Sequence, residues 1–213
     1  MKQRILSMCG VIAPLLFVFM AILGGAIRPG YSHIANTVSE LLSPGSPNRL
    51  FLSIIFTAYA LLMALFGIGI LLFIRRTEQS APIGIIGASM FIAAGLINVA
   101  IATVYPQDPW GSPPTFAGEM HINLSGVIGL LQLLSISLLG IWFNRARIFP
   151  GFGAYSFLTA GAVILLVGFF LMMAGNPIMG FTERILVVVG LLWTFVLALW
   201  MVSRSSYAGW RSL

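Results

Sequence analysis

Two histidines and four acidic side chains fall in short polar segments that separate long apolar runs. Imidazole and carboxylate groups together can act as general acid and base, or can hold a metal ion such as zinc. Ionisable groups are costly next to lipid, so their positions in an apolar chain are a guide to its function. The candidate polar site consists of these six residues and two neighbouring arginines: Arg28, His33, Glu40, Asp108, Glu119, His121, Glu183 and Arg184.

The spacing of these residues matches no catalytic or metal-binding motif. The chain has no HExxH helix motif, no G-x-S-x-G nucleophile elbow, and no phosphate-binding or dinucleotide fingerprint. A metal site would have to draw on His33, Glu40, Asp108 and His121, which are scattered along the chain. The sequence therefore identifies no cofactor and no catalytic residue, and it leaves open whether the protein is an enzyme.

Polar residues form a stripe along one face of the apolar run that begins at His121. On a helical wheel of roughly 100° per residue, Ser125, Gln132 and Ser135 lie within about 40° of His121. Such a stripe faces other helices or a water-filled cavity. Hydrogen bonding between helices is the simpler interpretation for Gln132 and Ser135, and a pocket lining is the alternative.

The elements that must position these residues are six apolar runs of helix length. The chain has 213 residues, of which 59% are hydrophobic and 8% are charged. A membrane-spanning helix needs about 20 consecutive apolar residues, and lipid tolerates no unpaired backbone groups. The sequence therefore predicts an all-α integral membrane bundle, one transmembrane domain over residues 1–213. The predicted spans are approximately 6–27, 50–74, 83–104, 121–143, 156–174 and 184–203.

The basic residues predict the orientation of the bundle. Eight of the 11 lysines and arginines lie near the N-terminus, in the second and fourth connections, and near the C-terminus. Positive residues are retained on the cytoplasmic side, so we expect both termini in the cytoplasm and the protein in the inner or plasma membrane. The candidate polar site then faces outward. Because topology accounts for the net charge of +6, we expect contacts with the lipid bilayer and no nucleic-acid partner.

The first outer connection contains an amphipathic segment over residues 32–42. Ile34, Val38, Leu41 and Leu42 recur at the spacing of one helix face, with polar residues on a second face. We expect a short amphipathic helix lying in the membrane interface. Its polar face would turn to water or cover the outer mouth of the bundle.

Short motifs in these connections carry a family resemblance. They are RPGYS at 28–32, TVSEL at 37–41, YPQD at 105–108, His121, TER at 182–184 and GLLW at 190–193. With these motifs the chain resembles, over nearly its whole length, a family of prokaryotic multi-pass membrane proteins, the domain of unknown function 998. The resemblance implies a six-helix membrane protein and no established activity. A more distant likeness is to membrane hydrolases that bind a metal with His, Asp and Ser, whose paired histidines this chain lacks.

Three functions are compatible with these features. The abundance of small and aromatic residues, without a catalytic motif, favours a non-enzymatic accessory or binding protein, such as a subunit packed against other membrane proteins. The first alternative is an outward-facing enzyme, with or without a metal, that acts on a lipid or headgroup. The second alternative is a small-molecule transporter or sensor, which needs a cavity along the stripe at Gln132.

Overall fold

The computed structural model describes residues 2–77 and 81–206, which form six long helices and one short 3-10 helix. All six long helices are apolar enough and long enough to cross a membrane. Each predicted span corresponds to one of them, which confirms the predicted all-helical membrane bundle. The elements are α1 (Lys2–Ile27), η1 (Ser39–Leu42), α2 (Arg49–Arg76), α3 (Pro82–Thr103), α4 (Phe116–Ala146), α5 (Phe152–Met172) and α6 (Met179–Ser206).

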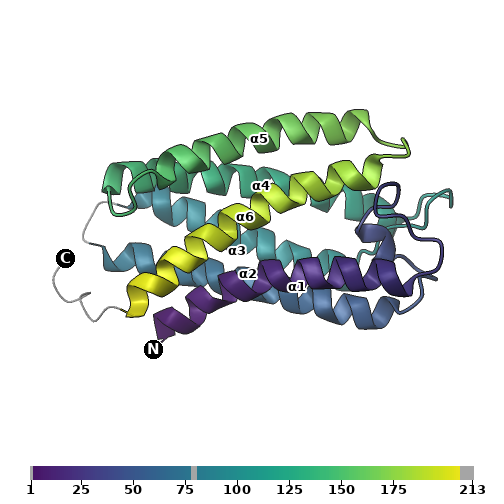
Figure 1. The fold of residues 1–213 in the computed structure, drawn as a ribbon, viewed down its shortest axis with the longest axis horizontal. Helices are drawn as coiled ribbons and strands as arrows, with labels where there is room; N and C mark the ends of the chain where they lie inside the picture. The colour runs from purple at the N-terminus through teal and green to yellow at the C-terminus, as the bar shows by residue number, and fades with distance from the viewer. Residues whose placement is uncertain (1, 78–80, 207–213) are drawn as a thin grey trace.

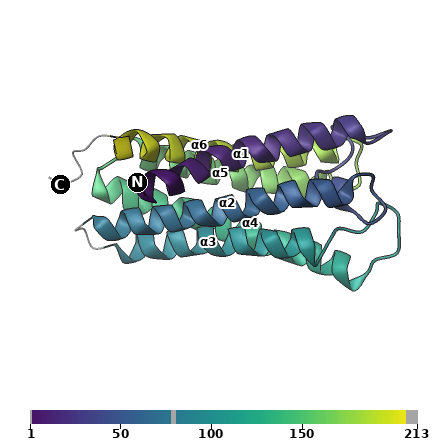
Figure 2. The same cartoon turned by 90° about the horizontal axis from the view of Figure 1, so that it is seen from below.

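The long helices form a ring in which each packs against the helices before and after it, and α6 packs against α1. Successive helices run in opposite directions, so α1 begins and α6 ends at the same end of the bundle (Figure 1). Figure 2 shows α1, α2 and α3 side by side along the long axis. We call the opposite end the cap end. Its connections are cap loop 1 (28–48), cap loop 2 (104–115) and cap loop 3 (173–178).

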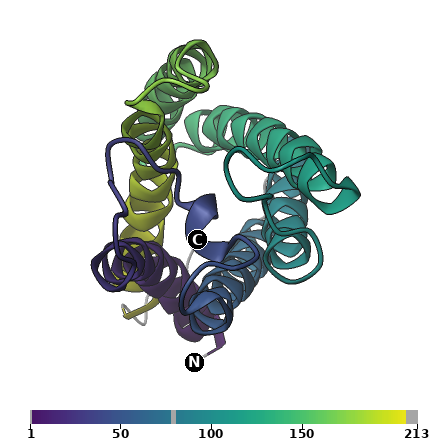
Figure 3. The same cartoon turned by 90° about the vertical axis from the view of Figure 1, so that its right-hand side faces the viewer.

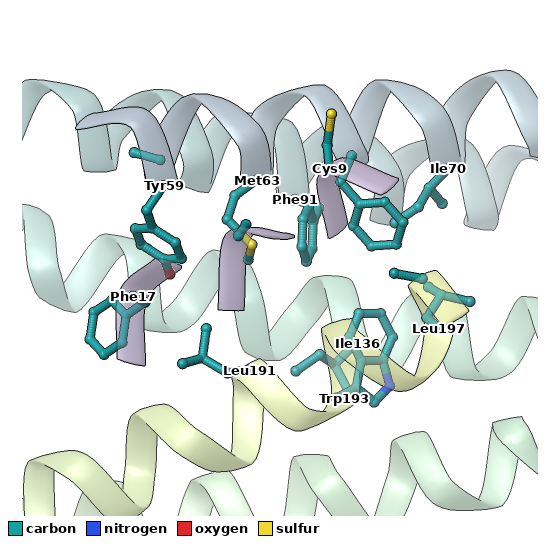
Figure 4. Packing of buried hydrophobic residues seen from close by; sticks show 14 of the residues in the cluster. Cys9, Phe17, Tyr59, Met63, Ile70, Phe91, Ile136, Leu191, Trp193 and Leu197 are labelled. Carbon is teal, nitrogen blue, oxygen red and sulfur yellow. The ribbon is translucent and has the colours of Figure 1, made fainter. Parts of the chain in front are cut away.

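Aromatic side chains fill the ring away from the cap end. Trp193 of α6 is fully buried (Figure 4), and its indole N–H donates to Ser156 Oγ of α5 at 2.9 Å. Further along, the Phe149 ring stacks on Phe152 and on Trp200, with ring centroids 4.7 and 4.5 Å apart. Large flat rings bury much apolar area in these positions, so they join α5 and α6 to the rest of the bundle at the end where α1 begins.

Glycines allow the first three helices to approach one another closely. A Cβ atom on Gly95 of α3 would lie 2.8 Å from the backbone nitrogen of Ala64 in α2. One on Gly69 of α2 would lie 2.9 Å from Leu6 Cβ in α1. Small residues allow such close packing between helices in membranes. In their most apolar windows, 44–50% of α1–α3 is buried, against 28% of α4 and 22% of α5.

Cap loop 1 folds as turns followed by η1, and the helix predicted over 32–42 is therefore shorter than expected. The carbonyl of Ile34 accepts a hydrogen bond from the Phe181 backbone N–H of α6 at 2.8 Å. The carbonyl of His33 accepts one from the Arg184 guanidinium. These contacts hold the backbone of residues 33–34 against α6 in a turn conformation.

Three of the four residues of the predicted apolar face of cap loop 1 are buried, whereas the fourth, Ile34, is 57% exposed. Val38, Leu41 and Leu42 are 3%, 0% and 6% exposed. Viewed from the cap end, η1 lies over the centre of the ring of helices (Figure 3). The loop therefore closes the mouth of the bundle with these three apolar side chains pointing inward.

Candidate functional site

Glu40 is buried in cap loop 1, where its carboxylate organises the loop's own backbone. One oxygen accepts from the Thr37 backbone N–H at 2.9 Å and from the Thr37 hydroxyl at 3.3 Å. The other accepts from the Asn36 side-chain amide at 2.8 Å. The Glu40 carbonyl accepts from the Arg28 guanidinium at the end of α1. A buried carboxylate needs such partners, and here they fix η1 against α1.

Arg184 joins cap loop 1 to the first turns of α6. Its Nη1 donates to the carbonyls of His33 and Asn36 at 2.7 and 2.8 Å, and its Nη2 donates to the Tyr31 hydroxyl. That hydroxyl donates in turn to the Thr37 carbonyl at 2.7 Å. Burial raises the pKa of Tyr31 to about 12, although the Arg184 charge opposes the rise. The planar guanidinium suits this task because it presents several fixed donors.

Glu183, the preceding residue of α6, binds the start of η1. Its Oε2 accepts a hydrogen bond from the Val38 backbone N–H at 2.6 Å. We call Arg28, Tyr31, Glu40, Glu183 and Arg184 the cap network. In the contacts described above, the side chains of the cap network bind backbone groups or neutral side chains, so they serve to hold the loop in place.

His121 lies near the start of α4 and joins both long cap loops. Its Nδ1 contacts the Tyr105 carbonyl oxygen at 2.9 Å, and its Nε2 contacts the Ser39 hydroxyl oxygen at 3.2 Å. The side chain is only 6% exposed. Ser39 and His121 line a small cavity with Leu42 and Pro106, which holds about 10 Å³ of free space. This is room for a single water molecule.

Asp108 fixes cap loop 2 to the start of α4. Its carboxylate accepts from the Thr115 backbone N–H at 2.8 Å and from the Thr115 hydroxyl at 2.7 Å. These two bonds hold the pKa of Asp108 below its usual range, and the nearby His121 acts in the same direction. Thr115 is also the N-cap of α4, since its hydroxyl oxygen accepts from the Gly118 N–H at 3.2 Å. The carboxylate thus stabilises the turn that positions His121.

Comparison with known protein families assigns the chain to a family. A family described as "Protein of unknown function (DUF998)" matches residues 11–200. The chain belongs to the DUF998 family. The matched region includes the whole cap network as well as Ser39, Asp108 and His121. No curated protein and no solved structure matches the chain.

Two predicted site residues of this DUF998 chain stand apart from these contacts. The His33 imidazole is exposed and packs edge-on against Tyr31, with ring centroids 5.3 Å apart, while only its carbonyl joins the cap network. Partial burial, followed by the Arg184 charge, lowers the pKa of His33. Glu119 is exposed in the first turn of α4, where a negative charge interacts favourably with the helix dipole.

The predicted polar stripe on α4 changes character along its length. Ser125 is exposed and Gln132 is half-buried, whereas Ser135 is fully buried. The Ser135 hydroxyl has no hydrogen-bond partner within the described part of the chain. The stripe is therefore buried at His121, reaches the surface at Ser125 and ends inside the packed bundle.

At the cap end, the predicted site residues form two separate groups instead of a single site. The cap network contains four of them, and His121 lies near Asp108 in the second group. Within residues 2–77 and 81–206, no three His, Cys, Asp or Glu side chains gather closely enough to hold a metal ion. Sequence reasoning did not select Tyr31 or Ser39 as site residues, although both lie in the motifs that carry the family resemblance.

Proposed function

We propose that this protein is an accessory or binding protein of the membrane, and that the outer face of α4 and α5 receives a transmembrane helix of another protein. The observation that carries this proposal is a difference between two groups of glycines. In α3, a Cβ on Gly84 would lie 2.8 Å from the Trp142 ring, and one on Gly87 would lie 3.0 Å from Leu139 Cγ. These two glycines of α3 therefore allow close packing against α4 within the chain.

Gly140 and Gly153 likewise pack α4 against α5, but four other glycines of these two helices have no such use among the described residues. A Cβ atom at Gly126 or Gly129 of α4, or at Gly161 or Gly168 of α5, would meet nothing within 4 Å among the described residues. A glycine inside a helix costs about 1 kcal/mol relative to alanine. In a membrane, such residues allow a second helix to approach closely, so a partner helix would give these four positions the packing that this chain does not supply.

Polar side chains on the same part of α4 also favour a protein partner over lipid alone. Asn123 and Ser125 are both exposed near the cap end of the helix. Amide and hydroxyl groups form hydrogen bonds between helices in membranes, typically worth about 0.6 kcal/mol each. Because Thr115 and Asp108 fix the start of α4, both groups are held at defined positions near the cap end of the helix.

Site-specific photocrosslinking in native membranes tests the proposal. A photoreactive amino acid is placed at Gly126 or Gly168, and in matched controls at the exposed positions Leu15 of α1 and Ile54 of α2. The expected result is a discrete protein adduct from the α4 and α5 positions, identified by mass spectrometry, and only lipid adducts from the controls. Equal adducts from both faces, or an adduct only with a second copy of this chain, would overturn it.

We further infer that the cap end faces away from the cytoplasm. The support is the basic residues at the opposite end, such as Lys2, Arg4, Arg75 and Arg145, which the positive-inside rule retains in the cytoplasm. The test is single-cysteine labelling in a Cys9→Ser background with a membrane-impermeant maleimide applied to intact cells. A cysteine at Trp110 in cap loop 2 should react from outside, and labelling of that position only after cell lysis would reverse the orientation.

A further inference from the structure

The two contacts of His121 define the position of its proton. A carbonyl oxygen can only accept a hydrogen bond, so the 2.9 Å contact with the Tyr105 carbonyl requires that Nδ1 carry the hydrogen. In the neutral ring, Nε2 is then the acceptor. The Ser39 hydroxyl, 3.2 Å from Nε2, must therefore be the donor in that contact.

This arrangement is that of a serine activated by a general base. Such a pair needs a hydroxyl within hydrogen-bond reach of an imidazole nitrogen, and a third group that fixes the ring through its other nitrogen. Ser39 supplies the hydroxyl and the Tyr105 carbonyl fixes the ring. The Asp108 carboxylate lies close enough to interact with His121. Its negative charge would favour the imidazolium that forms when the base takes a proton.

The surroundings of Ser39 limit what could react there. The residue is half-buried at the first position of η1, and it lines the small cavity at the cap end together with His121. The adjoining cavity has apolar walls that include Leu42, Phe56 and Ile101, and its free space of about 10 Å³ matches one water-sized group. A methyl group would fit this space, whereas a long acyl chain would not.

We propose that Ser39 and His121 form a nucleophile and general-base pair that cleaves short-chain acyl esters at the cap end. Ser39 Oγ adds to the ester carbonyl while its proton passes to His121 Nε2. The bond from the carbonyl carbon to the alcohol oxygen breaks, and the imidazolium gives its proton to the departing alcohol. Water then attacks the acyl–serine ester, His121 takes the water proton and returns it to Ser39, and a carboxylic acid leaves.

This activity goes beyond the proposed docking of a partner helix and does not depend on it. The docking face consists of glycines on the outside of α4 and α5, whereas the proposed reaction uses side chains under cap loop 1. A failed crosslinking experiment leaves the esterase proposal unaffected, and the reverse also holds.

The test uses the full-length protein purified in mild detergent, with p-nitrophenyl acetate as the probe. We expect release of nitrophenol above the buffer rate, and an acetyl group on the peptide that contains Ser39. Ser39→Ala and His121→Ala should reduce both to the background. Ser43→Ala is the matched control, since Ser43 is a buried serine four residues away whose hydroxyl has no partner within the described residues.

Two further readouts separate catalysis from a structural role of the same contact. Ser39→Cys keeps a nucleophile of similar size, so its thiol should be acetylated to a thioester. This result distinguishes loss of the nucleophile in Ser39→Ala from a mere loosening of the loop. Acylation of the wild-type protein should slow at acidic pH, because a protonated imidazole cannot accept the serine proton. Three results would overturn the proposal. They are a wild-type rate equal to that of Ser39→Ala, acetylation only at residues other than Ser39, and a faster reaction with p-nitrophenyl octanoate than with p-nitrophenyl acetate.

Discussion

Glu183 Oε2 accepts a hydrogen bond from the Val38 backbone N–H at 2.6 Å, which joins two residues 145 positions apart in the chain. Arg184 binds the same loop through the His33 and Asn36 carbonyls. Hydrogen bonds donated by a guanidinium are roughly twice as strong as neutral ones. Cap loop 1 and the start of α6 should therefore lose their structure together when the protein unfolds.

Replacing Glu183 should lower the stability of the bundle. Glu183→Ala leaves the Val38 N–H without its partner, and an unsatisfied buried donor costs about 1–3 kcal/mol. Glu183→Gln keeps an acceptor oxygen and should lose less. The measurement is thermal unfolding in detergent with a dye that reacts with Cys9, the only cysteine and a buried one. Equal transition temperatures for the wild type and Glu183→Ala would show that this bond carries no stability.

Two glycines of α6 should respond in opposite ways to an added methyl group. At Gly180 a Cβ would overlap the Asn36 carbonyl oxygen, so Gly180→Ala must displace cap loop 1 and should cost about 1–3 kcal/mol. At Gly190 a Cβ meets nothing within 4 Å of the described structure, so Gly190→Ala should be neutral or stabilise the helix by up to about 1 kcal/mol. The same Cys9 assay compares them, and a destabilised Gly190→Ala with an unchanged Gly180→Ala contradicts this packing.

Tyr31 should make the cap sensitive to alkaline pH. Burial raises the pKa of its hydroxyl from 10.0 to about 12 in the folded protein. Because the folded pKa is the higher one, the contribution of Tyr31 to stability is fully present below pH 10 and is lost as the pH rises through 12. Absorbance at 295 nm, compared between the wild type and Tyr31→Phe, isolates this ionisation. A difference signal that titrates near pH 10 would contradict burial of the hydroxyl.

Arg184 should be irreplaceable by lysine, although both carry a positive charge. A lysine presents one compact ammonium group and cannot reach the His33 carbonyl, the Asn36 carbonyl and the Tyr31 hydroxyl with the same geometry. Arg184→Lys should therefore loosen cap loop 1 and speed its cleavage by chymotrypsin after Tyr31. Arg49→Lys, at the start of α2, is the matched control and should be cleaved at the wild-type rate. Identical rates for the two variants would mean that charge alone holds the loop.

Much of the fold could be predicted from the sequence, because lipid imposes few solutions on an apolar chain. Each of the six predicted apolar runs became a helix. In the 32–42 segment, Val38, Leu41 and Leu42 are buried as the periodicity indicates, but Ile34 is exposed. The length of that helix was not predictable. The segment gives its carbonyls to Arg184 and Phe181, which lie about 150 residues later, and no local pattern contains that information.

For the candidate site, too, the sequence and the tertiary structure determined different features. The sequence by itself determined that Glu40, Asp108, His121, Glu183 and Arg184 lie outside the central apolar runs or at their ends, because ionisable groups are costly within lipid. Only the tertiary structure decided which of them meet. It placed Glu40 and Arg184 in a network that binds backbone, because buried charges need hydrogen-bond partners. It also brought the Ser39 hydroxyl to His121, a contact across 82 residues set by how η1 closes the mouth of the ring.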